Sequence, residues 1–243
     1  MGNGTLANRA IVIAGAGSGM GRATALAAAA AGANLVLVAR SSTALDDIVR
    51  DITAAGGSAT AIPTDVTDHA AVAALMDEAL ARLGRIDALI NTVGTNIKGR
   101  ALGDLTAESW NAMLAVNLTS AFNLTQAVVP AMRRQGAGLI VHVSSSAAKK
   151  PDPSGVAYQA TKAGLVGLAH GTMEEERQHG IRTSVIFPGL TDTPMVLKRP
   201  TPTPPDVLAR ALQPEDVAAA VMFILGLPAR THVPELLLYP SGI

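Results

Sequence analysis

The chain has 243 residues, of which 49% are hydrophobic and 16% charged, so it carries enough apolar surface for a folded core and is not typical of a disordered chain. Its 19 basic and 19 acidic residues give a formal net charge of zero, which argues against a nucleic-acid-binding surface. The sequence has no cysteine, which excludes disulfides and thiolate chemistry, and its five histidines show no metal-ligand spacing, so we predict no metal site.

Short apolar segments alternate with longer alanine-rich segments along the chain. The short ones, predicted as strands, are Ala10–Ala14, Leu35–Val38, Ala59–Ile62, Ala88–Ile90, Leu139–Val143, Thr183–Phe187 and Leu236–Tyr239. The longer ones, predicted as helices, are Gly21–Ala31, Thr43–Ala54, Asp68–Arg82, Ala107–Arg134, Tyr158–His179 and Pro214–Leu225. Apolar strands separated by helices are typical of parallel sheets covered on both faces. We therefore predict an α/β fold: a single Rossmann-type doubly wound domain over residues 1–243, with a parallel seven-stranded sheet.

The turn after the first predicted strand is rich in glycine and reads Gly15-Ala16-Gly17-Ser18-Gly19-Met20-Gly21. Such a turn lets backbone N–H groups approach a pyrophosphate, and the N-terminus of the helix that follows adds a partial positive charge. Its position between a strand and a helix favours a dinucleotide site over a purely structural turn.

The second predicted strand ends in Ala39-Arg40-Ser41-Ser42, and the first acidic residue of the chain is Asp46. An NAD-preferring site places a carboxylate at this strand end, whereas a guanidinium there can bind the 2′-phosphate of NADP. We expect NADP(H) to be favoured over NAD(H). The alternative is that Arg40 is an ordinary surface arginine.

Tyr158 precedes Lys162 by four residues in a predicted helix, so the two side chains share one face. A phenol has a pKa near 10, and a nearby ammonium favours its phenolate. The phenol can also donate its proton to a carbonyl oxygen, so Tyr158 can act as acid or base. The alternative is that its ring only packs. Ser144, Ser145 and Ser146 follow the fifth strand, and chemistry alone does not decide which hydroxyl would hold a substrate oxygen.

Two features concern the rest of the pocket and the surface. Thr193–Pro205 carries five prolines and is expected to be a loop, either a connector or part of a substrate loop at about 190–212. The expected pocket segments 95–99, 147–156 and 190–211 show no charge pair that would identify a substrate. Lys149-Lys150 could attract an acidic substrate or be plain surface, and Glu174–Glu176 is expected to be a solvated helix face.

Taken together, these motifs resemble the short-chain dehydrogenase/reductase family along nearly the full chain. The family's glycine motif matches Gly15, Gly19 and Gly21, its adenine contact matches Asp65 and Val66, and its fourth-strand motif matches Asn91-Thr92-Val93-Gly94. The segment that contacts the nicotinamide is similar to Pro188-Gly189 with Thr191 and Thr193, and Arg40 resembles the NADP-preferring branch. Ala14 departs from the family's usual threonine.

The resemblance implies roles for four residues. Asn117 would hold a water in a proton relay, Ser145 would orient the substrate oxygen, Tyr158 would transfer the proton, and Lys162 would bind the nicotinamide ribose and tune Tyr158. The cofactor-binding set that we expect is Gly15, Ser18, Gly19, Met20, Gly21, Arg40, Asp65, Val66, Asn91, Gly94, Tyr158, Lys162, Pro188, Gly189, Thr191 and Thr193.

The function expected from these residues is NADP(H)-dependent hydride transfer between the nicotinamide and a small alcohol/carbonyl substrate, as in a carbonyl reductase or alcohol dehydrogenase. The alternatives are a non-redox enzyme on this fold, such as an epimerase or dehalogenase, and a catalytically silent NADP-binding regulatory protein. The family resemblance implies a homodimer or homotetramer. Met1–Leu6 contains no signal pattern and the chain has no run of about 18 apolar residues, so we expect a cytoplasmic protein with no membrane partner.

Overall fold

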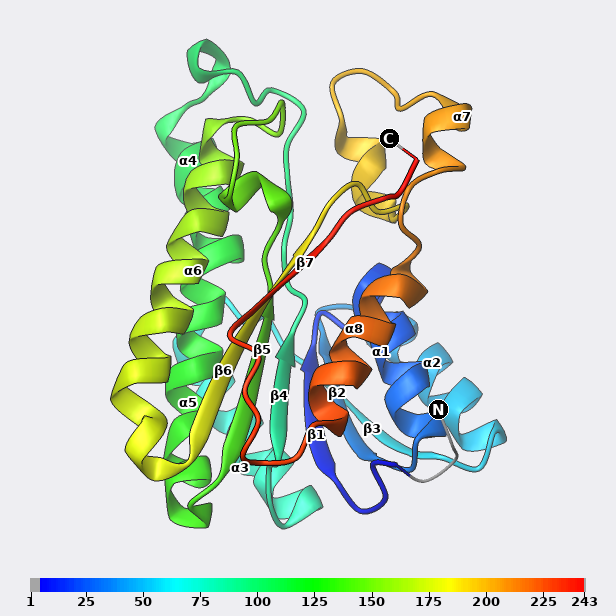
Figure 1. The fold of residues 1–243 in the computed structure, drawn as a ribbon, viewed down its shortest axis with the longest axis vertical. Helices are drawn as coiled ribbons and strands as arrows, with labels where there is room; N and C mark the ends of the chain where they lie inside the picture. The colour runs from blue at the N-terminus through cyan, green and yellow to red at the C-terminus, as the bar shows by residue number, and fades with distance from the viewer. Residues whose placement is uncertain (1–4, 243) are drawn as a thin grey trace.

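Seven parallel strands form one sheet through the centre of the computed structural model, which describes residues 5–242 (Figure 1). In the order β3-β2-β1-β4-β5-β6-β7, the strand order reverses between β1 and β4, and ligands of doubly wound sheets bind beyond the carboxyl ends of the strands at this point. Part of the N-terminal segment Met1–Leu6 lies outside the described residues. The strand bounds are β1 (Ala10–Ala14), β2 (Asn34–Ala39), β3 (Ser58–Pro63), β4 (Ala88–Asn91), β5 (Gly138–Val143), β6 (Ile181–Pro188) and β7 (Glu235–Leu238).

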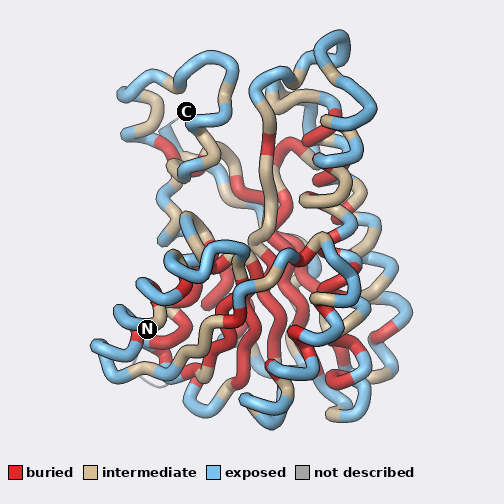
Figure 2. The backbone as a smooth tube through the Cα atoms, turned by 180° about the vertical axis from the view of Figure 1, so that it is seen from behind, coloured by how far each residue is buried: buried red, intermediate tan, exposed pale blue. Residues whose placement is uncertain are grey.

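Helices cover both faces of the sheet (Figure 1). One face carries α1 (Gly19–Ala30), α2 (Ser42–Ala54) and α8 (Pro214–Gly226). The other carries α3 (His69–Leu83), α4 (Ala107–Leu114), α5 (Ser120–Gln135) and α6 (Val156–Glu176). Successive strand residues point to opposite faces, so Ile11 and Ile13 of β1 join one apolar layer while Val12 and Ala14 join the other. The buried strands at the centre of Figure 2 show the result, and the predicted α/β fold class is confirmed.

The predicted helix Ala107–Arg134 is wrong in one respect, because a π-helical turn at Ala115–Thr119 separates α4 from α5. Asn117 lies in this turn and is almost fully buried, with its side-chain amide hydrogen-bonded to the backbone of Thr95. One extra residue per turn reorients side chains locally, and such turns are frequent at functional sites. Helical periodicity in a sequence does not reveal it, since the apolar pattern continues through the turn.

The proline-rich segment is a loop above the carboxyl ends of the strands, with two short helical pieces. A 3-10 turn covers Pro194–Lys198, and the four-residue helix α7 (Pro205–Leu208) starts on a proline, which the first helical position tolerates. The expected solvated face at Glu174–Glu176 is wrong for Glu176. That side chain is 3% exposed and accepts a hydrogen bond from Arg133 Nε at 2.7 Å, so an ion pair compensates its burial.

One helical stretch qualifies the expectation that no segment could span a membrane. Ala107–Gln135 is long and apolar enough to do so by length and composition alone. Half of its most apolar window is buried inside the molecule, where α5 packs on α3 and on β5. This burial is typical of a core helix.

Candidate active site

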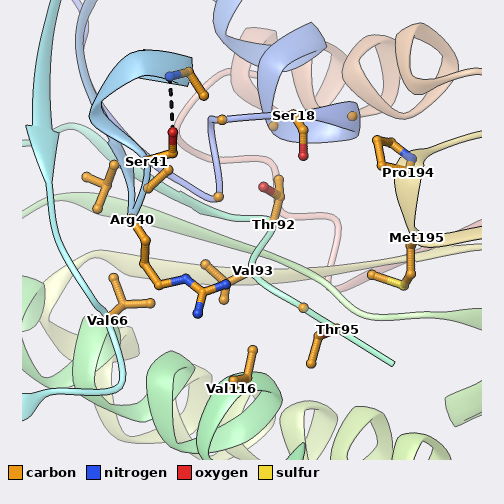
Figure 3. A pocket seen from close by; sticks show the side chains of 18 of the residues that line it. Ser18, Arg40, Ser41, Val66, Thr92, Val93, Thr95, Val116, Pro194 and Met195 are labelled. Carbon is orange, nitrogen blue, oxygen red and sulfur yellow. Dashed lines mark hydrogen bonds between the residues drawn. The ribbon is translucent and has the colours of Figure 1, made fainter. Parts of the chain in front are cut away.

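A cleft of about 810 Å3 opens at the carboxyl ends of the central strands (Figure 3). Its walls come from the glycine-rich turn, the end of β2, the segment after β3, the segment after β4 and the start of the proline-rich loop. Ten of the expected cofactor-binding residues line it: Gly15, Ser18, Gly19, Met20, Gly21, Arg40, Asp65, Val66, Gly94 and Thr193.

The glycines of the first turn are needed for its shape. Gly15 has φ +84° and Gly19 has φ +50°, and residues with a Cβ adopt such positive φ angles only at a cost in free energy. A Cβ on Gly21 would lie 2.1 Å from the carbonyl oxygen of Gly15, so only glycine lets the helix start this close to the turn. The first turn of α1 contains no acidic residue, so its partial positive charge faces the cleft unopposed. These features fit a bound pyrophosphate.

Thr92, which the sequence showed only as part of the fourth-strand motif, bonds to the end of β1 at Ala14. Its Oγ1 donates a hydrogen bond of 2.9 Å to the Ala14 carbonyl oxygen, and its backbone N–H donates to the same oxygen. The end of β1 is thus tied to the end of β4 from the β4 side. The only signal in the sequence was a threonine in the fourth-strand motif.

Arg40 and Asp65 occupy the part of the cleft beside β2 and β3. Figure 3 shows the Arg40 side chain extending into the cavity from the end of β2, and no hydrogen bond or ion pair joins its guanidinium to another residue within 5–242. Hydrogen bonds from the Thr67 backbone N–H and hydroxyl, at 3.0 and 2.8 Å, hold Asp65 Oδ1 and lower the pKa of that carboxyl, with a smaller contribution from the charge of Arg40.

A second, smaller cavity of about 110 Å3 lies beside the cleft, and Tyr158 and Ser145 form part of its wall. Met20, Thr193 and Met195 line both spaces, so the two adjoin each other. Burial raises the pKa of the Tyr158 phenol, and a hydrogen bond with Ser145 opposes this effect. At neutral pH Tyr158 is therefore protonated, which suits a proton donor.

Ser145 differs from the two serines beside it. The Ser144 hydroxyl is buried and donates to the Lys162 carbonyl oxygen at 2.9 Å, so it fixes the loop to α6. The Ser145 Oγ accepts a hydrogen bond from Ala147 N–H and contacts the phenol. All three serines line the small cavity, but Ser145 is the one that influences Tyr158.

Lys162 is 3% exposed, and its Nζ donates to the Val143 carbonyl oxygen at 3.1 Å. Burial without a carboxylate partner lowers its pKa to about 8. Its Nζ lies 5.9 Å from the centre of the Tyr158 ring, and a Cβ on Gly94 would lie 3.1 Å from it. Gly94 therefore lets the backbone of the fourth-strand motif approach the ammonium.

Asn117 joins three parts of the site. Its Oδ1 accepts from Thr95 N–H at 2.7 Å, while its Nδ2 donates to the Thr95 carbonyl oxygen and to Thr161 Oγ1. Thr161 lies next to Lys162 on α6, so Asn117 fixes the segment after β4 against that helix. We call Asn117, Ser145, Tyr158 and Lys162, for which the family resemblance implies roles in proton transfer, the proton-transfer cluster.

The remaining expected residues lie around these two spaces. Pro188, Gly189 and Thr191 line the small cavity, and Thr191 Oγ1 donates to the Gly189 carbonyl oxygen. Asn91 lines neither space: its Oδ1 accepts from Val93 N–H at 3.0 Å, so it shapes the turn that carries Gly94.

Three charged residues also line the small cavity. Asp152 and Arg199 belong to the expected pocket segments 147–156 and 190–211, Arg100 follows the expected segment 95–99, and the three come from different loops. The Lys149-Lys150 pair lies outside both spaces. Lys149 forms an ion pair with Glu235, and Lys150 lies over the ring of Tyr239.

A family model described as short chain dehydrogenase matches residues 9–203 of the chain. The chain belongs to the short-chain dehydrogenase family. A sepiapterin reductase of Chlorobaculum tepidum is 35% identical over 208 residues, which are 86% of this chain and 83% of that relative. Membership in the family makes the chain one of the short-chain dehydrogenase/reductase oxidoreductases and accounts for the dinucleotide cleft.

Solved structures of other family members share the fold. A metagenomic short-chain oxidoreductase in complex with NADP superposes with a TM-score of 0.85 at 34% identity, over 98% of this chain and 99% of that one. A 3-ketoacyl-(acyl-carrier-protein) reductase from Brucella melitensis complexed with NADH gives a TM-score of 0.88 at 26% identity, over 97% and 98% of the two chains. Both nicotinamide dinucleotides thus occur among similar short-chain dehydrogenases.

Proposed function

We propose that this short-chain dehydrogenase is an NADP(H)-dependent carbonyl reductase or alcohol dehydrogenase that acts on a small substrate. The observation that supports this most is the place of Tyr158: a buried, protonated phenol beside the Ser145 hydroxyl, in the wall of a small cavity that adjoins the dinucleotide cleft. A proton donor and a hydride source on two sides of one cavity are what carbonyl reduction needs.

The residues of the cleft fit a nicotinamide dinucleotide. The glycine-rich turn and the start of α1 would hold the pyrophosphate, Asp65 and Val66 would contact the adenine, and the segment around Thr191 and Thr193 would contact the nicotinamide. When bound, this cofactor supplies the hydride in reduction and accepts it in oxidation.

The proton-transfer cluster handles the proton. In reduction, the Ser145 hydroxyl holds the substrate oxygen, and Tyr158 gives its O–H proton to that oxygen as the carbonyl carbon receives hydride. In oxidation, the tyrosinate takes the alcohol proton while hydride leaves the carbon. The Lys162 ammonium favours the tyrosinate, and Asn117 keeps the segment after β4 in place against α6.

Arg40 supports a preference for NADP(H). Its guanidinium stands at the end of β2, which itself ends in no carboxylate, and Ser41 caps α2 beside it. We also propose that residues 190–212 form the substrate loop, because this segment contributes to the wall of the small cavity.

We also propose that the protein is cytoplasmic and forms a homodimer or homotetramer. The α5 and α6 surface offers an exposed Phe122, and Gly167 and Gly171 leave open space above α6. Close approach of a second copy is possible there. A monomeric mass by light scattering would contradict this part.

The experiment that tests the proposed reaction follows NADPH absorbance with a panel of small aldehydes, ketones, oxo acids and oxo esters. We expect turnover with part of the panel, and we expect Tyr158→Phe to lower kcat by about 1,000-fold or more while NADPH binding, measured by fluorescence, stays within about 3-fold. Turnover that survives in Tyr158→Phe would refute the role of the phenol. A panel without any NADPH oxidation would refute the reaction.

A further inference from the structure

The wall of the small cavity contains two arginines that have no part in the proposed proton transfer. Arg100 comes from the segment after β4 and Arg199 from the proline-rich loop, and both are half-buried in its wall. Neither lines the dinucleotide cleft, so the phosphates of a cofactor do not account for them.

The two guanidinium groups are bonded only to neutral acceptors. Arg100 Nε donates to the Ile97 carbonyl oxygen at 2.9 Å and Nη2 donates to the Lys198 carbonyl oxygen at 2.7 Å. Arg199 Nη1 donates to Thr203 Oγ1 at 3.0 Å. Within residues 5–242, neither guanidinium takes part in an ion pair.

Asp152 is the acidic residue of the cavity wall, and among residues 5–242 it forms no ion pair with either arginine. Its Oδ1 accepts a hydrogen bond from Ser154 N–H at 2.7 Å. Burial lowers the pKa of Arg100, the charge of Arg199 lowers it further, and the charge of Asp152 opposes them to a smaller extent, so the repulsion between the two guanidinium groups is only partly offset. An anionic group between them would relieve that repulsion and gain charge-assisted hydrogen bonds.

We propose that the substrate is a small carbonyl compound that carries a carboxylate, and that Arg100 and Arg199 bind this carboxylate. The inference rests on the proposed function, because the carbonyl end would face Ser145 and Tyr158, which line the same cavity. A volume of about 110 Å3 lies below the roughly 300–1,000 Å3 typical of pockets for drug-sized ligands. It suits a short oxo acid. Planar guanidinium groups match a carboxylate better than they match a neutral ester.

Arg199 is the better residue to substitute, since Arg100 also ties its loop to the proline-rich loop. The probes are acetoacetate and 2-oxobutanoate, each compared with its methyl ester. We expect the wild-type protein to prefer the acids by about 10-fold or more in kcat/KM. Arg199→Gln should lose about 10-fold or more with the acids, mainly through KM, and change less than about 3-fold with the esters. Lys98→Gln, an exposed cation near Arg100 outside both spaces, is the matched control and should change neither.

The outcomes separate this inference from the proposed function. If the esters are reduced as well as the acids, or if Arg199→Gln affects both alike, the carboxylate site is refuted while the reductase remains. If no carbonyl compound of any kind oxidises NADPH, both the carboxylate site and the proposed reductase function are refuted. An inhibition assay on the wild-type protein avoids the risk that a variant misfolds. Butanoate should inhibit ester reduction competitively and butanamide should not. Equal inhibition by the two compounds would overturn the inference.

Discussion

The proton-transfer cluster and the two arginines of the small cavity are held by different parts of the fold. Tyr158 and Lys162 are buried on α6, Lys162 bonds to the backbone of β5, and Asn117 bonds to the backbone of Thr95 and to the Thr161 hydroxyl. Arg100 and Arg199 lie on loops, are half-buried, and bond to carbonyl and hydroxyl oxygens of those loops. Helix-borne groups with fixed partners suit a chemistry shared by a family, whereas loop-borne groups suit the choice of substrate.

Replacing Lys162 with methionine tests the buried, helix-borne part of this comparison. We expect kcat to fall by about 1,000-fold, because the ammonium that favours tyrosinate and would bind the ribose is lost. We expect the Tm to rise by about 2–5 °C at pH 7, because an unpaired buried cation is removed. Kinetic assays and calorimetry measure the two effects.

The pH dependence of that stability gain has a definite sign. Burial lowers the pKa of Lys162 to about 8 in the folded protein, below the usual value of 10.5, so the cost of the buried ammonium is fully present below pH 8. It disappears as the pH rises from about 8 to 10.5. The Tm difference between Lys162→Met and the wild type should shrink over this range, and a constant difference would contradict the account.

Arg40, which follows β2 and lies outside the proton-transfer cluster, should affect binding rather than kcat. Arg40→Ala should raise the KM for NADPH by about 10- to 100-fold and leave the KM for NADH within about 3-fold, because only NADPH carries the 2′-phosphate. Arg50→Ala, an exposed arginine on α2 that pairs with Asp47, is the matched control. An equal rise in the KM for both cofactors would show that Arg40 does not bind the 2′-phosphate.

Gly155 tests how closely the loops around the small cavity pack against each other. Gly155 has φ +91°, and a Cβ there would lie 2.6 Å from the Arg100 carbonyl oxygen. Gly155→Ala should lower the free energy of unfolding by about 1–3 kcal/mol and raise the KM for oxo acids more than that for esters. Gly103→Ala, where a Cβ meets nothing within 4 Å, should do neither. Chemical denaturation provides the first measurement.

The smallest expected effect concerns the core beneath the cluster. Burial lowers the pKa of His142 to about 3, and Asn91 Nδ2 donates to its Nδ1, so the ring is neutral with its proton on Nε2, toward Thr125. The unfolded state, with a pKa of 6.5, binds one more proton between these values, so stability falls as the pH drops below 6.5. The loss should be about 1 kcal/mol at pH 5.5 and should be smaller in His142→Gln. His179→Gln is the control, and an unchanged slope in His142→Gln would contradict the buried neutral ring.

Much of the fold could be predicted from the sequence, because parallel strands are apolar runs and their periodicity is local. Tyr158 and Lys162 were found from helical spacing, and the glycine-rich turn from its position after a strand. The π-helical turn at Asn117 could not be found, since the apolar pattern of the sequence continues through it. The hydrogen bonds of Asn117 to Thr95 could not be found either, since the two residues are distant in sequence. That Arg100 and Arg199 line one cavity could not be predicted either, because only the folded loops bring them together.

The measurement that tests the central claim most directly is deuterium transfer. NADPH that carries deuterium at both C4 positions of the reduced nicotinamide is incubated with a substrate from the carbonyl panel, and the product is analysed by mass spectrometry. The account predicts one deuterium on the former carbonyl carbon per turnover with the wild-type protein, and about 1,000-fold less labelled product with Tyr158→Phe. Product without deuterium, or equal labelling by Tyr158→Phe, would contradict it.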